Sequence, residues 1–212
     1  MGNYHHCYKM TWDTGSAPNP YHDVLTLAIC KPGIRKHSQV GDWISGWTGK
    51  NVHGKDGKSH FFNEQKLIYL AKIKEKLTFA EYWERFPQKR PQIICCNQEP
   101  TTKKSCGGSS KVMKVVYDSG DNIYKPIEDG IAPLKQVPNN NHKKEDMERD
   151  LKGEFVLICE EFYYYGVDNA LDVSKDIFNV TVPRWKKMSE SDSSKLIDFV
   201  RNDNHATIKG NV

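Results

Sequence analysis

The stretch Asp13-Thr14-Gly15-Ser16-Ala17-Pro18-Asn19-Pro20 begins a pattern that determines the expected fold. It is followed by Cys30-Lys31-Pro32-Gly33-Ile34-Arg35 and by Gly41-Asp42-Trp43-Ile44, with short apolar runs at 24–29 and 40–44. Gly, Pro, Asn and Asp favour turns, and apolar runs bounded by turns are typical of strands. The first fifth of the chain therefore predicts strands joined by tight turns. A carboxylate, an amide, a thiol and two cations stand at the ends of these strands.

The later sequence adds regular elements of both kinds. Thr78 is followed three residues later by Glu81, the pattern of a capping box, which predicts a helix starting at Thr78. Residues 48–60 are rich in glycine and lysine, so we expect an exposed loop there. The other expected elements are strands at 66–73 and 155–159 and a closing amphipathic helix at 190–200.

These elements predict one α+β domain over residues 1–212, a length that suits a single buried core. We expect a mixed or antiparallel, β-barrel-like sheet with short flanking helices and long loop insertions. Residues 86–111, with Pro87, Pro91, Pro100 and Gly107-Gly108, and residues 125–150, with Asn139-Asn140-Asn141, are predicted to be those insertions.

The composition excludes several classes of protein. No apolar run approaches the roughly 20 residues that span a bilayer, and no secretion signal is recognisable, so we expect a cytoplasmic protein with no membrane partner. The six cysteines are then expected to be reduced thiols. Their spacing matches no structural zinc motif, and no glycine-rich phosphate-binding motif is present, so we expect no metal and no cofactor. The net charge of +4 is compatible with a nucleotide ligand but does not demonstrate one.

Three residues are candidates for catalysis. Cys30 stands beside Lys31, and a neighbouring cation favours the reactive thiolate form of a cysteine. Asp13 and His142 are the candidates for acid–base work. Cysteine catalysis also needs a nearby base, for which the sequence offers His22, His37 and His142. The alternative interpretation is a buried structural cysteine at the end of a strand.

A second set of residues has side chains suited to binding a nucleotide. An amide such as Asn19 can pair with a base edge, a cation pair such as Lys31 and Arg35 suits a phosphate, and an aromatic ring can stack on a base. Turns and buried cores use the same residue types, so a structural role is the alternative for each. The ligand-binding candidates are Asn19, Lys31, Arg35, Asp42, Trp43, Asp121, Asn122 and Tyr124.

The motifs form an ordered set along the chain. Its members include Asp13-Thr14-Gly15, Cys30-Lys31-Pro32, Gly41-Asp42-Trp43-Ile44, Gly120-Asp121-Asn122-Ile123-Tyr124, His142, Asp150-Leu151 and Phe162-Tyr163-Tyr164-Tyr165-Gly166. This set resembles the type-two family of nucleotide-modification-associated domains over most of the chain. The resemblance implies a bacterial or phage protein linked to systems that modify nucleobases in DNA. The Cys- and Lys-rich stretch 95–111 matches no motif of that family.

A weaker similarity concerns arrangement alone. A strand ending in a basic turn, a Val-Gly-Asp-Trp strand start and a Phe-Ala-Glu-Tyr-Trp helix are similar to the base-reading β-barrels of the pseudouridine-synthase-associated class. In such barrels a turn before a strand helps to line a nucleobase pocket.

These observations predict a domain that binds a nucleotide or modified nucleobase within a modification system. The base is either free or part of DNA, and a separate modification enzyme is a candidate partner. One alternative is an enzyme that modifies a nucleotide or DNA base, with Cys30, Asp13 or His142 as the catalytic residue. Another is an interaction protein whose polar turns are only structural.

Overall fold

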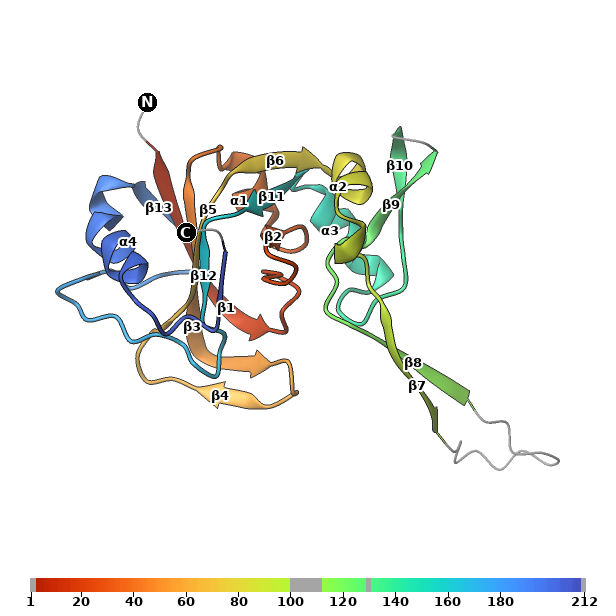
Figure 1. Ribbon diagram of the computed structural model, residues 1–212, viewed down its shortest axis with the longest axis horizontal. Helices are drawn as coiled ribbons and strands as arrows, with labels where there is room; N and C mark the ends of the chain where they lie inside the picture. The colour runs from red at the N-terminus through yellow and green to blue at the C-terminus, as the bar shows by residue number, and fades with distance from the viewer. Residues whose placement is uncertain (1–2, 100–111, 129–130, 211–212) are drawn as a thin grey trace.

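A mixed seven-stranded sheet forms one side of the molecule in the computed structural model, which describes residues 3–99, 112–128 and 131–210 (Figure 1). Its strands follow the order β13-β1-β3-β5-β12-β14, and β4 also pairs with β3. β1 and β3 are parallel, and the other pairs are antiparallel. The bounds are β1 (Tyr4–Asp13), β3 (Trp43–Gly54), β4 (Ser59–Phe61), β5 (Leu67–Lys72), β12 (Phe162–Tyr164), β13 (Lys186–Ser189) and β14 (Ile208–Lys209).

A second, antiparallel sheet consists of β2 (Leu25–Leu27), β11 (Phe155–Cys159) and β6 (Glu75–Thr78), in that order. The chain passes between the two sheets four times: from β1 to β2, from β2 to β3, from β5 to β6 and from β11 to β12. The last two connections are short. The large sheet nevertheless ends at β13 and β14, which pair with one neighbour each. The α+β class is confirmed, whereas the barrel-like closure is wrong, since no sheet closes within the described ranges.

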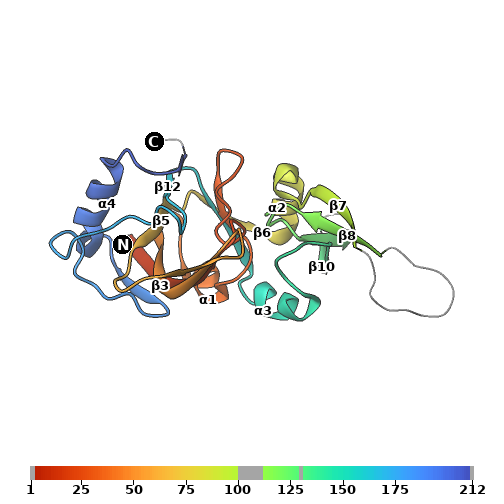
Figure 2. The same cartoon turned by 90° about the horizontal axis from the view of Figure 1, so that it is seen from below.

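The two segments predicted as loop insertions contain regular structure. Residues 86–111 include a 3-10 turn, η1 (Pro87–Lys89), and β7 (Ile93–Glu99), which pairs with β8 (Val112–Tyr117). This hairpin projects away from the two sheets (Figures 1 and 2). Residues 100–111 and 129–130 lie outside the described residues. Residues 125–150 contribute most of the hairpin of β9 (Tyr124–Glu128) and β10 (Ile131–Gln136), then the 3-10 turn η2 (Lys144–Asp146) and the start of α3 (Met147–Leu151).

Four short helices complete the described part of the chain: α1 (Pro32–His37), α2 (Phe79–Arg85), α3 and α4 (Ser194–Arg201), the last preceded by the 3-10 turn η3 (Ser191–Ser193). The capping box of α2 is confirmed, because Thr78 Oγ1 accepts from the Glu81 N–H at 3.2 Å and the Glu81 carboxylate accepts from the Thr78 N–H at 2.8 Å. The closing amphipathic helix is also confirmed as α4. No described helix is long and apolar enough to cross a membrane.

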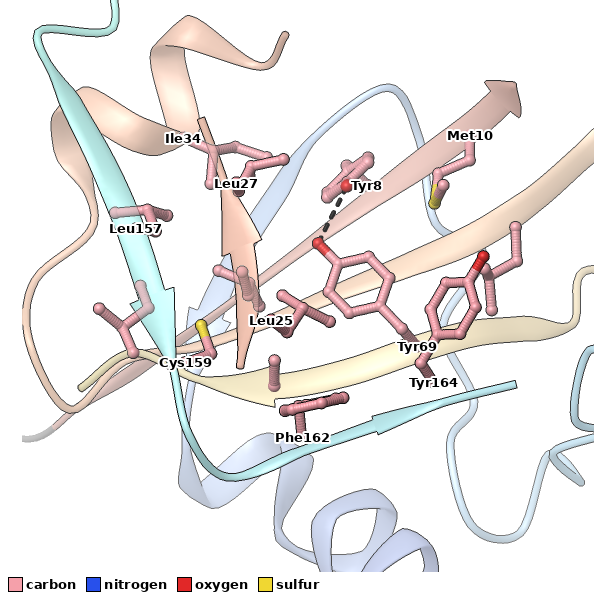
Figure 3. Close-up of a cluster of buried hydrophobic side chains, with 14 of the residues drawn as sticks. Tyr8, Met10, Leu25, Leu27, Ile34, Tyr69, Leu157, Cys159, Phe162 and Tyr164 are labelled. Atoms are coloured by element: carbon pink, nitrogen blue, oxygen red, sulfur yellow. Dashed lines mark hydrogen bonds between the residues drawn. The ribbon is translucent and has the colours of Figure 1, made fainter. Parts of the chain in front are cut away.

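The main core cluster joins the two sheets and holds the segment that carries Cys30. Figure 3 shows side chains from β1, β2, β5, β11 and β12 meeting there, with the Tyr69 hydroxyl donating to the Tyr8 hydroxyl at 2.9 Å. Ile34 of α1 packs in the same cluster. Burying each such apolar side chain contributes about 1.5–3 kcal/mol, so β2 and α1 are firmly anchored on both sides of Cys30.

Candidate functional site

Cys30 lies in a sharp turn between β2 and α1. Its φ is 60° and that of Lys31 is 42°, left-handed conformations that side-chain-bearing residues rarely adopt. Two hydrogen bonds hold the turn: the Cys30 N–H donates to Asp150 Oδ1 at 2.9 Å, and Arg35 Nε donates to the Cys30 carbonyl at 2.8 Å. The turn directs the half-buried thiol into a pocket.

His142 lies beside this thiol, although it is 112 residues away in the sequence. Its Nε2 atom is 3.2 Å from Cys30 Sγ, and its Nδ1 atom is 2.5 Å from Asp150 Oδ2. The loop that carries His142 is held by Asn139, whose side-chain oxygen accepts the His142 N–H at 2.7 Å. A thiol, an imidazole and a carboxylate therefore form one hydrogen-bonded series.

Asp150 connects the parts of this series. It is fully buried on α3, which lies beside α1 (Figure 2). Besides His142 and the Cys30 N–H, its carboxylate accepts the Tyr124 hydroxyl at 2.8 Å. Burial acts to raise the pKa of Asp150, but the hydrogen bonds and charge of His142, with the Tyr124 and Cys30 bonds, outweigh it and lower the pKa below its usual value. Asp150 is thus ionised at neutral pH and orients the imidazole.

The pKa of His142 is raised from 6.5 to about 10. Burial acts to lower this pKa, but hydrogen bonding to Asp150 and Cys30 and the charges of both groups outweigh the burial. His142 therefore holds a second proton at neutral pH and lies as a cation against the sulfur.

This raised pKa predicts a specific pH dependence of stability. Because the folded pKa of about 10 exceeds the unfolded value near 6.5, the stabilisation is fully present below pH 6.5 and is lost as the pH rises through 10. We expect the free energy of unfolding to fall between about pH 7 and pH 10. Urea unfolding across this range should show a smaller fall in the His142→Gln variant, and an equal fall in both proteins would contradict the ion pair.

Cys30, His142 and Asp150 also have metal-ligating atoms within 4.8 Å of one another. The imidazole, however, lies between the other two groups, with Nε2 facing the sulfur and Nδ1 facing the carboxylate. A metal needs donor atoms that converge on one centre at about 2.0–2.3 Å. The geometry instead suits proton transfer along the series, so we assign no metal to it.

The pocket beside Cys30 has a volume of about 920 Å³. Its wall combines cations, amides and aromatic rings, which come from the first strand, the Cys30 turn, the His142 loop, α3 and the segment before β13. The polar and aromatic lining residues that matter below are Trp12, Lys31, Asn140, Asn141, Arg149, Arg184 and Trp185.

Four of the predicted site residues come together here. Cys30 and His142 are paired, and Tyr124 touches the series through Asp150. Lys31 lines the pocket, with its ammonium 4.5 Å from the centre of the Tyr8 ring. Burial, opposed by Cys30, lowers the pKa of Lys31.

Arg35 lies behind the site instead of in it. It is fully buried, and besides the Cys30 carbonyl its guanidinium donates to the carbonyls of Phe155, at 2.7 Å, and Asp150. Burial lowers its pKa to about 10 against the opposing charge of Asp150, so the side chain stays charged at neutral pH. Its hydrogen bonds account for a structural role.

Two predicted carboxylates are buried and do not line the pocket. Asp13 accepts from the Tyr164 hydroxyl at 2.8 Å and from the Val167 N–H at 2.7 Å. Asp42 accepts two backbone N–H groups at 2.8 Å and contacts His6 at 3.2 Å. The hydrogen-bond partners of Asp13 therefore include neither Cys30 nor His142, so Asp13 does not share an acid–base site with them.

The remaining predicted residues bind other parts of the fold. Asn19 donates to the Ser119 carbonyl at 2.9 Å, and Asp121 accepts from the Tyr82 hydroxyl at 2.7 Å. The amide of Asn122 donates to backbone carbonyls near α2, and the indole N–H of the buried Trp43 donates to Glu190 at 2.8 Å. None of these four predicted residues lines the pocket.

Sequence reasoning missed several residues of the site. Asp150 had a signal, because it stands in the Asp150-Leu151 motif that contributes to the family resemblance. No comparable signal marks the others, which are ordinary polar or aromatic residues until folding brings them to one pocket. They are Asn140, Asn141, Arg149, Arg184, Trp12 and Trp185.

Comparison with known proteins agrees with the resemblance seen in the motifs. The family described as "Nucleotide modification associated domain 2" matches residues 2–206, a range that includes every residue of the site. A search of curated proteins and a search of solved structures each found no match. Because the family match covers nearly the whole chain, this protein belongs to the nucleotide modification associated domain 2 family.

Proposed function

We propose that this domain is an enzyme of a nucleotide modification system in which Cys30 acts as a covalent nucleophile on a nucleotide or modified base. The observation that supports it is the series Cys30–His142–Asp150 at the wall of the pocket. A nucleophile in contact with a base, which is itself oriented by a third group, is the general arrangement of covalent catalysis.

The charges favour the reactive form of the sulfur. A protonated His142 lies 3.2 Å from Cys30 Sγ, and a cation at that distance stabilises a thiolate. Asp150 in turn stabilises the imidazolium and fixes its orientation. A protein that only recognised a base would need none of these three groups in this arrangement.

Such a series suits attack on a carbonyl-type carbon of the substrate. The Cys30 thiolate forms the C–S bond while the C–O π pair moves onto oxygen. When that pair returns, the bond to the leaving amine or alcohol breaks, and His142 Nε2 gives its proton to the leaving group. Water then attacks the thioester, its proton passes to His142, and the acid leaves as the thiolate is regenerated.

The pocket wall supports a nucleotide as the substrate. Its volume of about 920 Å³ falls in the usual range for small-molecule sites, roughly 300–1,000 Å³. Lys31, Arg149 and Arg184 supply cations for a phosphate, and the amides of Asn140 and Asn141 suit a base edge or a sugar hydroxyl. The phosphate role thus stays with Lys31 and passes from Arg35 to the other two arginines.

Protection from alkylation tests this function. We expect iodoacetamide to modify Cys30 at pH 6, and millimolar nucleoside 5′-monophosphate to slow that modification severalfold, because the ligand fills the pocket in front of the sulfur. Peptide mass spectrometry would follow each cysteine separately. The buried Cys7 and Cys159 provide internal controls that stay unmodified in the folded protein. An unreactive Cys30, or one that nucleotides leave equally reactive, would count against the proposal.

A further inference from the structure

Trp185 is an unusual member of the pocket wall. It follows Arg184 directly before β13, and it is 40% exposed, so it is no core residue. It nevertheless lines the same pocket as Cys30. Its ring also lies close to Gly33 of the helix after Cys30, where an added Cβ would be 3.4 Å from the indole Cζ3. The ring therefore stands beside the turn that carries the nucleophile.

The Trp185 ring is held in place from the protein side. Its indole N–H donates to His6 Nδ1 at 3.3 Å, and the two rings are nearly parallel, with centroids 6.0 Å apart and 19° between their planes. The ring of His37 lies 6.1 Å away at 31°. An exposed tryptophan on a flexible segment would sample several rotamers, whereas these contacts favour one orientation.

The group that holds Trp185 is itself buried and oriented. His6 is fully buried on β1, and its Nε2 atom is 3.2 Å from Asp42 Oδ2. Because an indole N–H can only donate, Nδ1 of His6 accepts and Nε2 carries the proton toward Asp42. Burial lowers the pKa of His6 despite Asp42, and the charges of Lys187 and His37 lower it further. Nδ1 is therefore unprotonated at neutral pH, and its lone pair accepts the Trp185 N–H.

Burying a histidine and a carboxylate is costly unless they are fully hydrogen-bonded. Here the pair stabilises one orientation of a half-exposed ring. A rigid aromatic ring in a pocket wall is a platform for a planar ligand, since base–aromatic stacking is available to every nucleobase. The cations Lys31, Arg149 and Arg184 line the same pocket and suit the phosphate of such a ligand.

On the basis of the proposed function above, we propose that Trp185 is the stacking platform for the nucleobase of a nucleoside 5′-phosphate in the Cys30 pocket. His6 and Asp42 are positioning residues that act through Trp185. The ligand class is therefore a planar base joined to a phosphate, with the base on the indole and the phosphate at the cations.

Calorimetric titration of the Cys30→Ala protein with AMP, CMP and ribose 5-phosphate tests this assignment without any chemistry. We expect Trp185→Ala to weaken AMP and CMP about 5- to 150-fold, the equivalent of about 1–3 kcal/mol of stacking. Ribose 5-phosphate has no base, so its affinity should not change, and it also reports that the pocket is intact. Phe61→Ala is the matched control, because Phe61 is 78% exposed and does not line the pocket.

Two further variants keep the test decisive if Trp185→Ala unfolds. In Trp185→Phe a ring remains, so nucleotide affinity should be largely kept. Nucleotide-induced quenching of tryptophan fluorescence, measured in a Trp12→Phe background because Trp12 lines the same pocket, should be lost. His6→Leu should weaken AMP but not ribose 5-phosphate, and His6→Gln, which retains an acceptor and a donor, should recover most of the affinity.

The outcomes separate this assignment from the covalent function. Equal AMP affinity in the parent and Trp185→Ala proteins, unchanged quenching in Trp185→Phe, or no nucleotide binding at all would overturn the stacking role. Cys30 alkylation at pH 6 in the absence of nucleotide is independent of stacking, so the nucleophile can stand while the platform fails. Conversely, Trp185-dependent binding with an unreactive Cys30 would support the platform and refute the covalent enzyme.

Discussion

Replacing Arg35 by methionine is expected to lower the free energy of unfolding by about 3–5 kcal/mol, because it removes a buried charge that several groups depend on. The guanidinium binds the carbonyls of Cys30, Asp150 and Phe155 in a fully buried position. Methionine would leave all three carbonyls without this partner. Gly153 packs so closely that an added Cβ would be 2.3 Å from Arg35 Cζ, so a water has little room to substitute.

Urea unfolding monitored by circular dichroism would measure this loss. The matched control is Arg85→Met, since Arg85 is on the surface of α2 and pairs with Glu75 at 2.8 Å. An exposed ion pair contributes less than about 1 kcal/mol. Equal losses in the two variants would show that Arg35 is not the structural centre of the Cys30 turn.

Replacing His142 by asparagine is expected to slow alkylation of Cys30 at pH 6 by about tenfold. An ordinary cysteine is only about 0.3% thiolate at that pH. The imidazolium of His142 lies 3.2 Å from the sulfur, and the asparagine variant loses this neighbouring cation. Rates measured by peptide mass spectrometry should converge near pH 9, where an unassisted thiol is itself largely ionised.

His37→Asn provides the control for this experiment, because His37 bonds to the Gly33 carbonyl on α1 instead of the thiol. Its alkylation rate should follow that of the unmodified protein at both pH values. A pH-independent decrease in the His142 variant would indicate a changed access to the sulfur, and it would contradict the thiolate–imidazolium pair.

Local signals identified several elements correctly. The run at Leu67–Lys72 is β5, the capping box at Thr78 begins α2, and the apolar spacing near the C-terminus forms α4. In each case a few neighbouring residues carry the preference, either as a continuous buried run, a reciprocal cap or one apolar helix face. Such preferences can be recognised in the sequence without knowledge of the tertiary structure.

Elements whose stability comes from residues distant in the sequence could not be predicted from local patterns. β1 (Tyr4–Asp13) lies inside the large sheet, but its two adjacent histidines are polar residues that interrupt the apolar pattern of a buried strand. The imidazole of His5 is hydrogen-bonded to Ser45 and Ser193, and that of His6 to Asp42 and Trp185. Likewise, much of the loop expected at 48–60 is a continuation of β3 and its partner β4.

The carboxylates and amides proposed for ligand binding show why residue type alone is a weak guide to a site. Asp13, Asp42 and Asp121 are buried, and each accepts hydrogen bonds from other parts of the protein. A buried structural carboxylate and a catalytic one have the same sequence signature, because both need hydrogen-bond donors nearby. Only the position of the pocket separates them.

The sequence by itself determined the family and the α+β class, and it named Cys30 and His142 among the candidate catalytic residues, because motifs and local periodicity can be recognised without knowing the fold. The tertiary structure alone decided that these two groups touch, that Asp150 orients them, that Arg35 supports the turn and that the sheets do not close into a barrel. The physical reason is distance along the chain. Contacts across 112 residues depend on how the sheets pack, and no neighbouring residue encodes that packing.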